Sequence, residues 1–342
     1  MRSFAPSARV ASRAPAVVVT NSLRFTGVKF HKGGTDIPAC ASVLITAHGQ
    51  GSLCHICWNK RKWYGMQIFI TMALVAAANA VVLKPVANMH SRPSEDADVV
   101  SQAIYASNLR VLEEQAGWAK VRTPDDYTGW MPLSSLRRLG SGEKIYASNG
   151  RVAEVESLFA NVYREPDVTK HQPLLTVPFE TKLEVIHEDS ATVRWLEVRL
   201  PDDRAGWLQR GDVTLDSKPL TVTETILFSK RFLRLPYFWG GASTFGFDCS
   251  GFTQMLCRRR GVTIPRDASV QAKWEGAVAV DRADLKPGDL LFFGESRITH
   301  AGMYIGDGQF INATTHEHPV VQISDLADPY WAKLFITARR IK

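Results

Sequence analysis

The sequence predicts an α+β protein in which two small all-β modules precede a domain of mixed helices and strands. An internal repeat predicts the modules, because Trp118–Trp130 aligns without gaps onto Trp195–Trp207 with eight of thirteen positions identical. A change of pattern predicts the third domain. There the helical segment Thr221–Leu233 leads to a cysteine at the start of a second predicted helix, and strands follow. A chain of 342 residues is long enough for three such units.

The first 65 residues carry the excess of positive charge. The chain has a formal net charge of +7, but residues 1–65 hold nine Lys/Arg and one acid, so the remaining 277 residues sum to −1. The nearly neutral remainder has no basic patch, and we expect no nucleic-acid partner. Residues 1–65 lack a sustained period of 2 or 3.6, which predicts a poorly structured extension. Cys40 and the Cys-His-Ile-Cys motif at 54–57 lack the four-ligand spacing of a zinc site, so we expect no metal.

Residues 66–80, together with the basic run that precedes them, have the three parts of a secretory signal peptide. A Lys-Arg-Lys run at 60–62 precedes the apolar stretch Ile68–Ala78, and the Ala-Asn-Ala ending predicts cleavage after Ala80. The alternative is a buried helix. The stretch is too short for a stable membrane anchor, and no cysteine follows the cleavage site to carry a lipid. We therefore expect export to the periplasm or cell surface of a bacterium, with a true start suspected near Met66.

Each copy of the repeat predicts a β-hairpin, because apolar and polar residues alternate on both sides of a Pro-Asp-Asp turn. Further strands are expected upstream of the two copies, at Leu109–Glu113 and Lys182–His187. These units resemble bacterial SH3-like domains, and we place them at 82–139 and 143–215. The resemblance implies that they bind the cell wall or build part of a neighbouring active site.

One position differs between the two copies of the repeat. Tyr127 in the first copy corresponds to Arg204 in the second. The scaffold therefore does not require tyrosine there, so Tyr127 either has a local function or is an ordinary exposed turn residue.

The mixed domain has a cysteine where a helix is expected to begin. The Tyr-Phe-Trp-Gly-Gly segment at 237–241 predicts a tight aromatic loop whose glycines permit close backbone approach. Asp248 is a candidate N-cap, so Cys249 would lie in the first turn, where the positive end of the helix favours a thiolate. Three arginines at 258–260 suit the other end of the helix dipole. Cys257 lies about 12 Å further along the helix, too far for a disulfide with Cys249, and is expected to pack as an apolar residue.

A histidine on a predicted strand supplies the base that a reactive cysteine needs. His300 belongs to the strand predicted at Thr299–Ile305, which a Gly-Asp-Gly turn connects to a second strand at Gln309–Ala313. A third polar group should fix the orientation of the imidazole. The candidates on or just beyond the second strand are Asn312, Thr314, His316 and His318.

Residues 226–341 resemble the NlpC family of bacterial cell-wall cysteine peptidases, whose catalytic core is papain-like. Five motifs follow the family's order: Tyr-x-Trp-Gly-Gly, Asp-Cys-Ser-Gly, Ile-Pro-Arg-Asp, Pro-Gly-Asp-Leu and His-Ala-Gly-Met-Tyr-Ile-Gly. The resemblance implies a catalytic domain over 222–342 with Cys249 as nucleophile and His300 as base. The third residue would be Asn312, where many members carry histidine. Asparagine can orient imidazole through its carbonyl oxygen, and His316 could serve instead if the hairpin is bulged.

Two SH3-like domains ahead of this core resemble the NlpC/p60 subgroup that cleaves γ-D-glutamyl bonds to L-diamino acids. That subgroup acts on peptidoglycan stem peptides with a free N-terminal L-Ala. The resemblance implies hydrolysis through a thioester, without a metal or organic cofactor, and an ion pair between Asp248 and the substrate ammonium. The other substrate-binding residues that it implies are Ser250, Tyr237 and Trp239, with Tyr127 and Asp98 from the first module.

Other functions stay open at this point. A D,L-endopeptidase acting on intact cell wall would use the SH3-like modules as wall anchors and would accept an N-acetylated stem peptide. A catalytically weak wall-binding protein would show no phenotype on loss of Cys249. An acyltransferase is compatible with a papain-like core, although the Gly-Gly and Asp-Cys-Ser-Gly context favours peptide hydrolysis.

Overall fold

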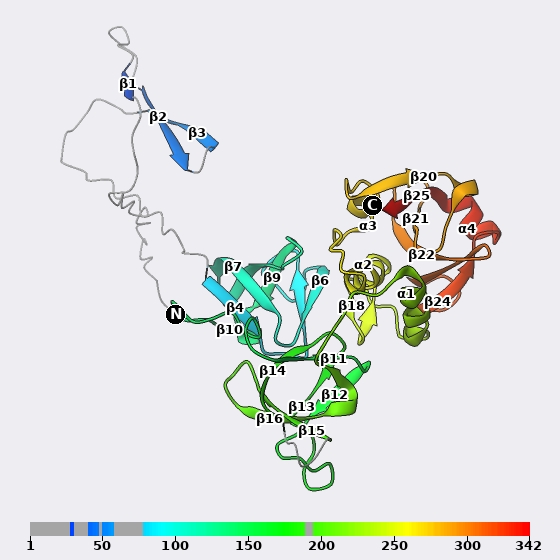
Figure 1. The fold of residues 1–342 in the computed structure, drawn as a ribbon. Helices are drawn as coiled ribbons and strands as arrows, with labels where there is room; N and C mark the ends of the chain where they lie inside the picture. The colour runs from blue at the N-terminus through cyan, green and yellow to red at the C-terminus, as the bar shows by residue number, and fades with distance from the viewer. Residues whose placement is uncertain (1–27, 31–39, 48–49, 58–77, 189–193) are drawn as a thin grey trace, which may run out of the picture. The chain divides into compact units, whose positions relative to one another are not determined.

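The computed structural model describes residues 28–30, 40–47, 50–57, 78–188 and 194–342 (Figure 1). The chain divides into two compact units, Met1–Leu74 and Val75–Lys342. Within the first unit, three strands form an antiparallel sheet in the order β1-β2-β3. They are β1 (Val28–Phe30), β2 (Cys40–Ala47) and β3 (Gln50–Cys57).

The three strands of the first unit differ from the prediction of a poorly structured extension over residues 1–65. The run Val43-Leu44-Ile45 has high strand propensity, which acts locally and needs no long hydrophobic period. The apolar part of the predicted signal peptide, up to residue 77, lies outside the described residues. None of the helices in the part of the chain that the structure describes is long and apolar enough to cross a membrane.

The first SH3-like module is a single antiparallel sheet in the order β10-β4-β7-β8-β9-β5-β6. Its core contains Val82, Met89, Val111, Val121 and Met131, of which none is more than 1% exposed. The strand predicted upstream of the repeat lies within β7. The strands are β4 (Ala78–Val82), β5 (Val86–His90), β6 (Val99–Ile104), β7 (Asn108–Gln115), β8 (Trp118–Arg122), β9 (Thr128–Pro132) and β10 (Leu136–Arg138).

Strand β4 starts the module four residues before the predicted boundary at residue 82. Ala80 pairs with Leu109 of β7 and with Arg138 of β10, and its side chain is fully buried. A small apolar residue fits this position because two neighbouring strands and the core enclose it. Cleavage after Ala80 stays a prediction, and it would remove three of the five residues of β4.

The second SH3-like module has a five-stranded sheet in the order β16-β15-β14-β11-β17 and a separate β12-β13 pair. Its core includes Val162, Leu183, Leu196 and Leu208, all fully buried. The strands are β11 (Val152–Val155), β12 (Phe159–Val162), β13 (Leu175–Pro178), β14 (Lys182–Glu188), β15 (Trp195–Arg199), β16 (Ala205–Gln209) and β17 (Val213–Thr214).

The sequence repeat corresponds to the β8–β9 and β15–β16 hairpins. In both turns the second aspartate of Pro-Asp-Asp adopts a left-handed conformation, with φ of 65° at Asp126 and at Asp203. Aspartate tolerates this region better than most residues. The repeated tripeptide therefore encodes the same turn twice.

The third domain has a six-stranded antiparallel sheet in the order β20-β25-β21-β22-β23-β24, with α2 packed against β22 and β23. The helix predicted at Thr221–Leu233 is present as α1, which a Thr221–Glu224 capping box begins. The helices are α1 (Val222–Ser229), α2 (Cys249–Arg259), α3 (Ala268–Gln271) and α4 (Pro329–Leu334). The strands are β18 (Ala242–Ser243), β19 (Gly246–Phe247), β20 (Ala277–Val280), β21 (Leu290–Phe293), β22 (His300–Gly306), β23 (Gln309–Thr314), β24 (Val320–Asp325) and β25 (Phe335–Ile341).

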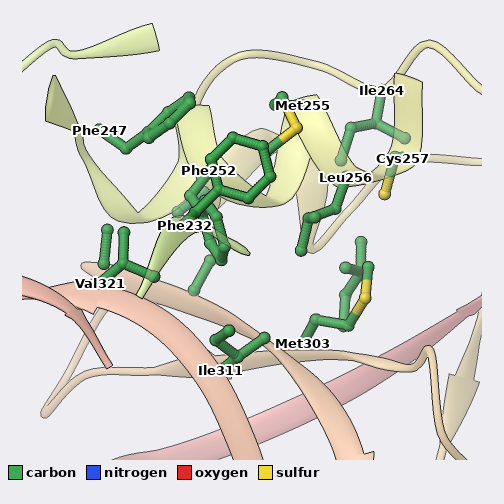
Figure 2. Packing of buried hydrophobic residues seen from close by; sticks show 14 of the residues in the cluster. Phe232, Phe247, Phe252, Met255, Leu256, Cys257, Ile264, Met303, Ile311 and Val321 are labelled. Carbon is green, nitrogen blue, oxygen red and sulfur yellow. The ribbon is translucent and has the colours of Figure 1, made fainter. Parts of the chain in front are cut away.

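The apolar face of α2 anchors the helix to this sheet. Figure 2 shows Phe252 and Leu256 of α2 over Met303 and Ile311 of the sheet, and all four are fully buried. Cys257 belongs to the same cluster and is a free thiol, which confirms its predicted packing role. The predicted α+β class with two all-β modules is confirmed, and this packing fixes the first turn of α2 beside β22.

Candidate active site

Cys249 is the first residue of α2 and is 7% exposed. The Asp248 side chain caps the helix, because its Oδ1 accepts a hydrogen bond from the Gly251 N–H at 2.6 Å. Glycine is needed at 251 because a Cβ there would collide with the carbonyl oxygen of Gly241. The Asp-Cys-Ser-Gly motif thus combines a helix cap, a thiol and a close backbone approach in four residues.

His300 begins β22 and lies half-buried beside the sheet. Its Nε2 is 2.9 Å from Oδ1 of Asn312 on β23, and Asn312 is fully buried. The Asn312 amide nitrogen donates to the Gln322 carbonyl at 3.3 Å and to Ser324 Oγ at 3.1 Å. Because both amide hydrogens are used there, Oδ1 faces the imidazole and accepts from Nε2–H. Nδ1 is then the nitrogen without a proton.

The other candidates for the third residue do not bond to the imidazole. The β22–β23 hairpin has a register shift between Tyr304 and Gly306, and Asn312 still reaches His300. The ring of His316 instead stacks on Tyr330, with centroids 3.8 Å apart. Of the residues that the sequence left open, Asn312 is therefore the one placed to hold the imidazole.

Cys249 lies beside the start of β22, because the backbone N–H of Ala301 points at its sulfur. Burial raises the pKa of the Cys249 thiol to about 12, and the Asp248 carboxylate adds to the shift. The N–H groups of Ala301 and Ser250 and the Arg266 guanidinium lower this pKa, as expected at a helix start, but burial outweighs them.

Burial is also the main influence on the pKa of the His300 imidazole. It lowers the pKa of His300 to about 4, against the opposing effects of Asn312 and Asp248. Both shifts favour the uncharged forms, a thiol at Cys249 and an imidazole at His300. This differs from the thiolate that the helix dipole alone predicts, because the sequence pattern shows the dipole and not the burial.

The Asp248 carboxylate already has a cationic partner within the protein. It forms a bidentate ion pair with Arg266, at 3.0 Å from Nη1 and 2.7 Å from Nη2. Arg266 is 3% exposed, and its Nη1 also donates to Ser250 Oγ at 2.9 Å. Both Asp248 and Ser250 therefore take part in a buried polar network, and the binding of substrate by either residue stays a prediction.

The first SH3-like module contributes Tyr127 to this region. Tyr127 Oη donates to Oδ1 of Asp267 at 3.3 Å. Burial, with the Asp267 carboxylate adding to it, raises the pKa of Tyr127 to about 12. Asp267 is exposed, and Ser101 of the same module accepts from Arg266 Nε at 3.0 Å. Sequence reasoning missed roles for Arg266 and Asp267, although both lie in the Ile-Pro-Arg-Asp motif.

Tyr237, Trp239 and Asp98 lie around the same site. Burial raises the pKa of the half-buried Tyr237, and the nearby Cys249 adds to the shift. Trp239 is 71% exposed. Asp98 is exposed. The next residue, Val99, packs closely on Gly240: its carbonyl oxygen would lie 2.7 Å from a Cβ added at Gly240, whose φ is 74°. Among the described residues, the Asp98 carboxylate has no hydrogen-bond partner.

The sequence was compared with known proteins. Residues 234–340 match the model of the NlpC/P60 family, and residues 89–136 match the model of the bacterial dipeptidyl-peptidase SH3 domain. The chain is 35% identical over 257 residues to a γ-D-glutamyl-L-lysine dipeptidyl-peptidase of Bacillus cereus (strain ATCC 10987 / NRS 248), a match that covers 70% of this chain and 74% of that protein. The chain belongs to the NlpC/P60 family of peptidases.

Other members of the NlpC/P60 family agree with this architecture. A γ-D-glutamyl-L-lysine dipeptidyl-peptidase of Bacillus subtilis (strain 168) is 29% identical, over 71% of this chain and 81% of that protein. The crystal structure of an NlpC/P60 family protein from Bacillus cereus ATCC 10987 aligns with a TM-score of 0.66 at 29% identity, covering 77% of this chain and 99% of that one. The match extends over the modules as well as the peptidase domain.

Proposed function

We propose that this NlpC/P60 protein hydrolyses the γ-D-glutamyl–L-diamino acid bond of peptidoglycan stem peptides with a free N-terminal L-Ala. Two features together carry the proposal. Cys249 lies beside the start of the strand on which Asn312 holds His300, and Tyr127 of the first SH3-like module reaches the Asp267 carboxylate of the peptidase domain. The names of the two dipeptidyl-peptidase relatives support the bond and the substrate.

The uncharged forms of Cys249 and His300 determine the first step of the mechanism. As Cys249 Sγ attacks the γ-carbonyl carbon, Nδ1 of His300 takes the thiol proton. The carbonyl becomes an oxyanion, and the Cys249 N–H, which has no acceptor among the described residues, is one donor for it. Asn312 accepts from Nε2–H and so stabilises the imidazolium that forms.

The second half of the reaction returns the proton. The oxyanion collapses, the C–N bond breaks and the imidazolium gives its proton to the leaving amine, so a thioester of Cys249 and the first product remain. Neutral His300 then takes a proton from water as the water oxygen attacks the thioester. Collapse of this second intermediate breaks the C–S bond, and the sulfur recovers its proton from the imidazolium.

We assign the substrate ammonium to Asp267 rather than to Asp248. The exposed Asp267 carboxylate has only the neutral Tyr127 hydroxyl as a hydrogen-bond partner among the described residues, whereas Arg266 satisfies Asp248. An ammonium would neutralise Asp267, and an N-acylated substrate would offer this carboxylate no cation. Asp98, which belongs to the first SH3-like module as Tyr127 does, supplies a second negative charge. Tyr237 and Trp239 line the cleft.

The predicted signal peptide supports export of the protein to the periplasm or cell surface of a bacterium. At that location peptidoglycan and the peptides released from it are the available substrates. The same substrates also suit the alternative of a D,L-endopeptidase that acts on intact wall. The requirement for a free amine separates the two functions.

The test is turnover of L-Ala-γ-D-Glu-meso-diaminopimelate by the purified protein, beside the same peptide acetylated at alanine. We expect cleavage of the free-amine peptide only, with release of diaminopimelate measured by chromatography, and complete loss of activity in Cys249→Ala. Equal cleavage of both peptides would make the enzyme an endopeptidase without an amine requirement. Full activity in Cys249→Ala would overturn the mechanism.

A further inference from the structure

A group of aromatic rings adjoins the His300 imidazole. Trp331 of α4 lies with its ring centroid 4.9 Å from that of His300, at an interplanar angle of 30°. His316, which follows β23, lies 5.5 Å from Trp331 and stacks on Tyr330 at 3.8 Å and 2°. We call the His316–Tyr330–Trp331 group the aromatic shelf.

The aromatic shelf has a buried base and an exposed outer ring. Trp331 is 3% exposed and anchors α4 in an apolar cluster with Phe293 and Phe310. Tyr330 is 45% exposed, although His316 covers one of its faces. An exposed aromatic ring that a buried neighbour holds in a fixed orientation is a preformed apolar contact surface.

The position of the aromatic shelf relates it to the released half of the substrate. The Asp248–Arg266 network and the Tyr127–Asp267 pair adjoin Cys249, whereas the aromatic shelf adjoins His300. This step rests on the proposed function, in which His300 gives a proton to the leaving amine. The residue that carries this amine therefore lies against the imidazole, and the aromatic shelf is an aromatic surface that adjoins this ring and is exposed at Tyr330.

We propose that His316 and Tyr330 form the subsite for the released residue, an L-diamino acid whose aliphatic side chain packs on the exposed Tyr330 ring. Lysine and diaminopimelate both have an unbranched chain of methylene groups that matches a flat apolar surface. A released residue without a side chain would leave the ring in water. The subsite therefore selects for the length of the aliphatic chain.

The experiment compares L-Ala-γ-D-Glu-L-Lys with L-Ala-γ-D-Glu-Gly in the wild type and in Tyr330→Ala. We expect the wild type to favour the lysine peptide in kcat/KM and Tyr330→Ala to reduce this preference by about tenfold, the effect of one or two methylene contacts. A purely structural role of Tyr330 would lower both rates equally and leave the ratio unchanged. The peptide that ends in meso-diaminopimelate should behave as the lysine peptide does.

The controls separate the possible failures. Phe245 is 47% exposed and packs on Phe159 with centroids 5.0 Å apart, so Phe245→Ala removes a comparable exposed ring elsewhere and should keep the wild-type ratio. Tyr330→Phe should also keep the wild-type ratio, because it keeps the ring. If Tyr330→Ala does not fold, His316→Ala takes its place in the experiment. An unchanged ratio in the folded variant, with an active wild type, overturns the subsite. A wild type that cleaves none of these peptides overturns the proposed function and the subsite with it.

Discussion

The two SH3-like modules share a repeated hairpin but contact different parts of the catalytic helix α2. The first module contacts the groups around the start of the helix: Ser101 accepts from Arg266, the arginine that holds the cap residue Asp248. The second module contacts the last turn, where Glu180 pairs with Arg258 at 2.6 Å and Glu154 with Arg259 at 3.0 Å. One module therefore adjoins the catalytic groups, and the other holds the helix from its far end.

The difference arises at two positions of the same turn. In the first module Asp125 accepts from Gln254 of α2 at 2.9 Å, and Tyr127 donates to Asp267. At the equivalent positions of the second module, Asp202 and Arg204 pair with each other at 2.8 Å. Both copies of the repeat thus form the same hairpin. The turn of the first module bonds to residues of the peptidase domain, whereas the turn of the second module forms an ion pair within itself.

The largest expected effect is on stability at the catalytic end of α2. Arg266→Met leaves the Asp248 carboxylate, which is 9% exposed, buried without its cation. Removing one partner of a buried ion pair costs about 3–5 kcal/mol. We expect urea denaturation to show a loss of this size in the free energy of unfolding, and the additional change Asp248→Asn to recover part of it.

The matched change at the far end is Arg258→Met. The two carboxylates are similarly buried, at 11% exposure for the Glu180 side chain and 12% for that of Asp248, but the Arg258 side chain is 42% exposed against 2% for Arg266. Removing Arg258 therefore lets water reach Glu180. Partly exposed pairs of this kind contribute about 0.2–1 kcal/mol. Equal losses for the Arg258 and Arg266 variants would contradict the distinction between the two ends.

A smaller effect is expected in the pH dependence of stability. The pKa of His300 is lowered from 6.5 to about 4 in the folded protein, so the unfolded chain binds this proton first as the pH falls. Stability should therefore decrease as the pH falls from about 6.5 and level off below about 4. The check is the urea midpoint between pH 4 and 8 in the wild type and in His300→Asn. Identical pH dependence in both proteins would show that His300 is not the group responsible.

Local patterns predict most of the elements around the site. The position of Cys249 at the start of α2 follows from the cap residue before it, and the His300–Asn312 contact follows from one hairpin. Both involve residues that are close in sequence, where turn chemistry and strand alternation determine the geometry. The identity of the third residue needed the structure, because the bulge between Tyr304 and Gly306 cannot be located from residue types.

The parts of the site that the sequence did not predict depend on contacts between domains. Arg266 meets Ser101 across 165 positions of the chain, and Asp267 meets Tyr127 across 140. The hydrophobic periods of the sequence do not predict such contacts between distant residues. The ionisation of Cys249 is a similar case, since the helix dipole is visible in the sequence and the burial that outweighs it is a property of the packed domains.

An effect on substrate binding rather than on stability tests the divergent position of the repeat directly. Tyr127→Phe keeps the ring and removes the hydroxyl that donates to Asp267. If this hydroxyl fixes the carboxylate that receives the substrate ammonium, KM for the free-amine tripeptide should rise about tenfold with kcat nearly unchanged. One hydrogen bond to a charged group is worth about 1.5–3 kcal/mol, which is at least this factor. Steady-state kinetics at neutral pH measures both constants.

The control is Arg204→Ala, the same position in the second module. The Arg204 side chain forms its hydrogen bond and ion pair with Asp202 of its own turn, and we expect its loss to leave both kinetic constants unchanged. A rise in KM for both variants would mean that the hairpins act through the general rigidity of the modules. A rise for Tyr127→Phe alone would show that the first module takes part in binding the substrate, because the two turns have the same backbone conformation at their second aspartate and differ in the side chain that follows it.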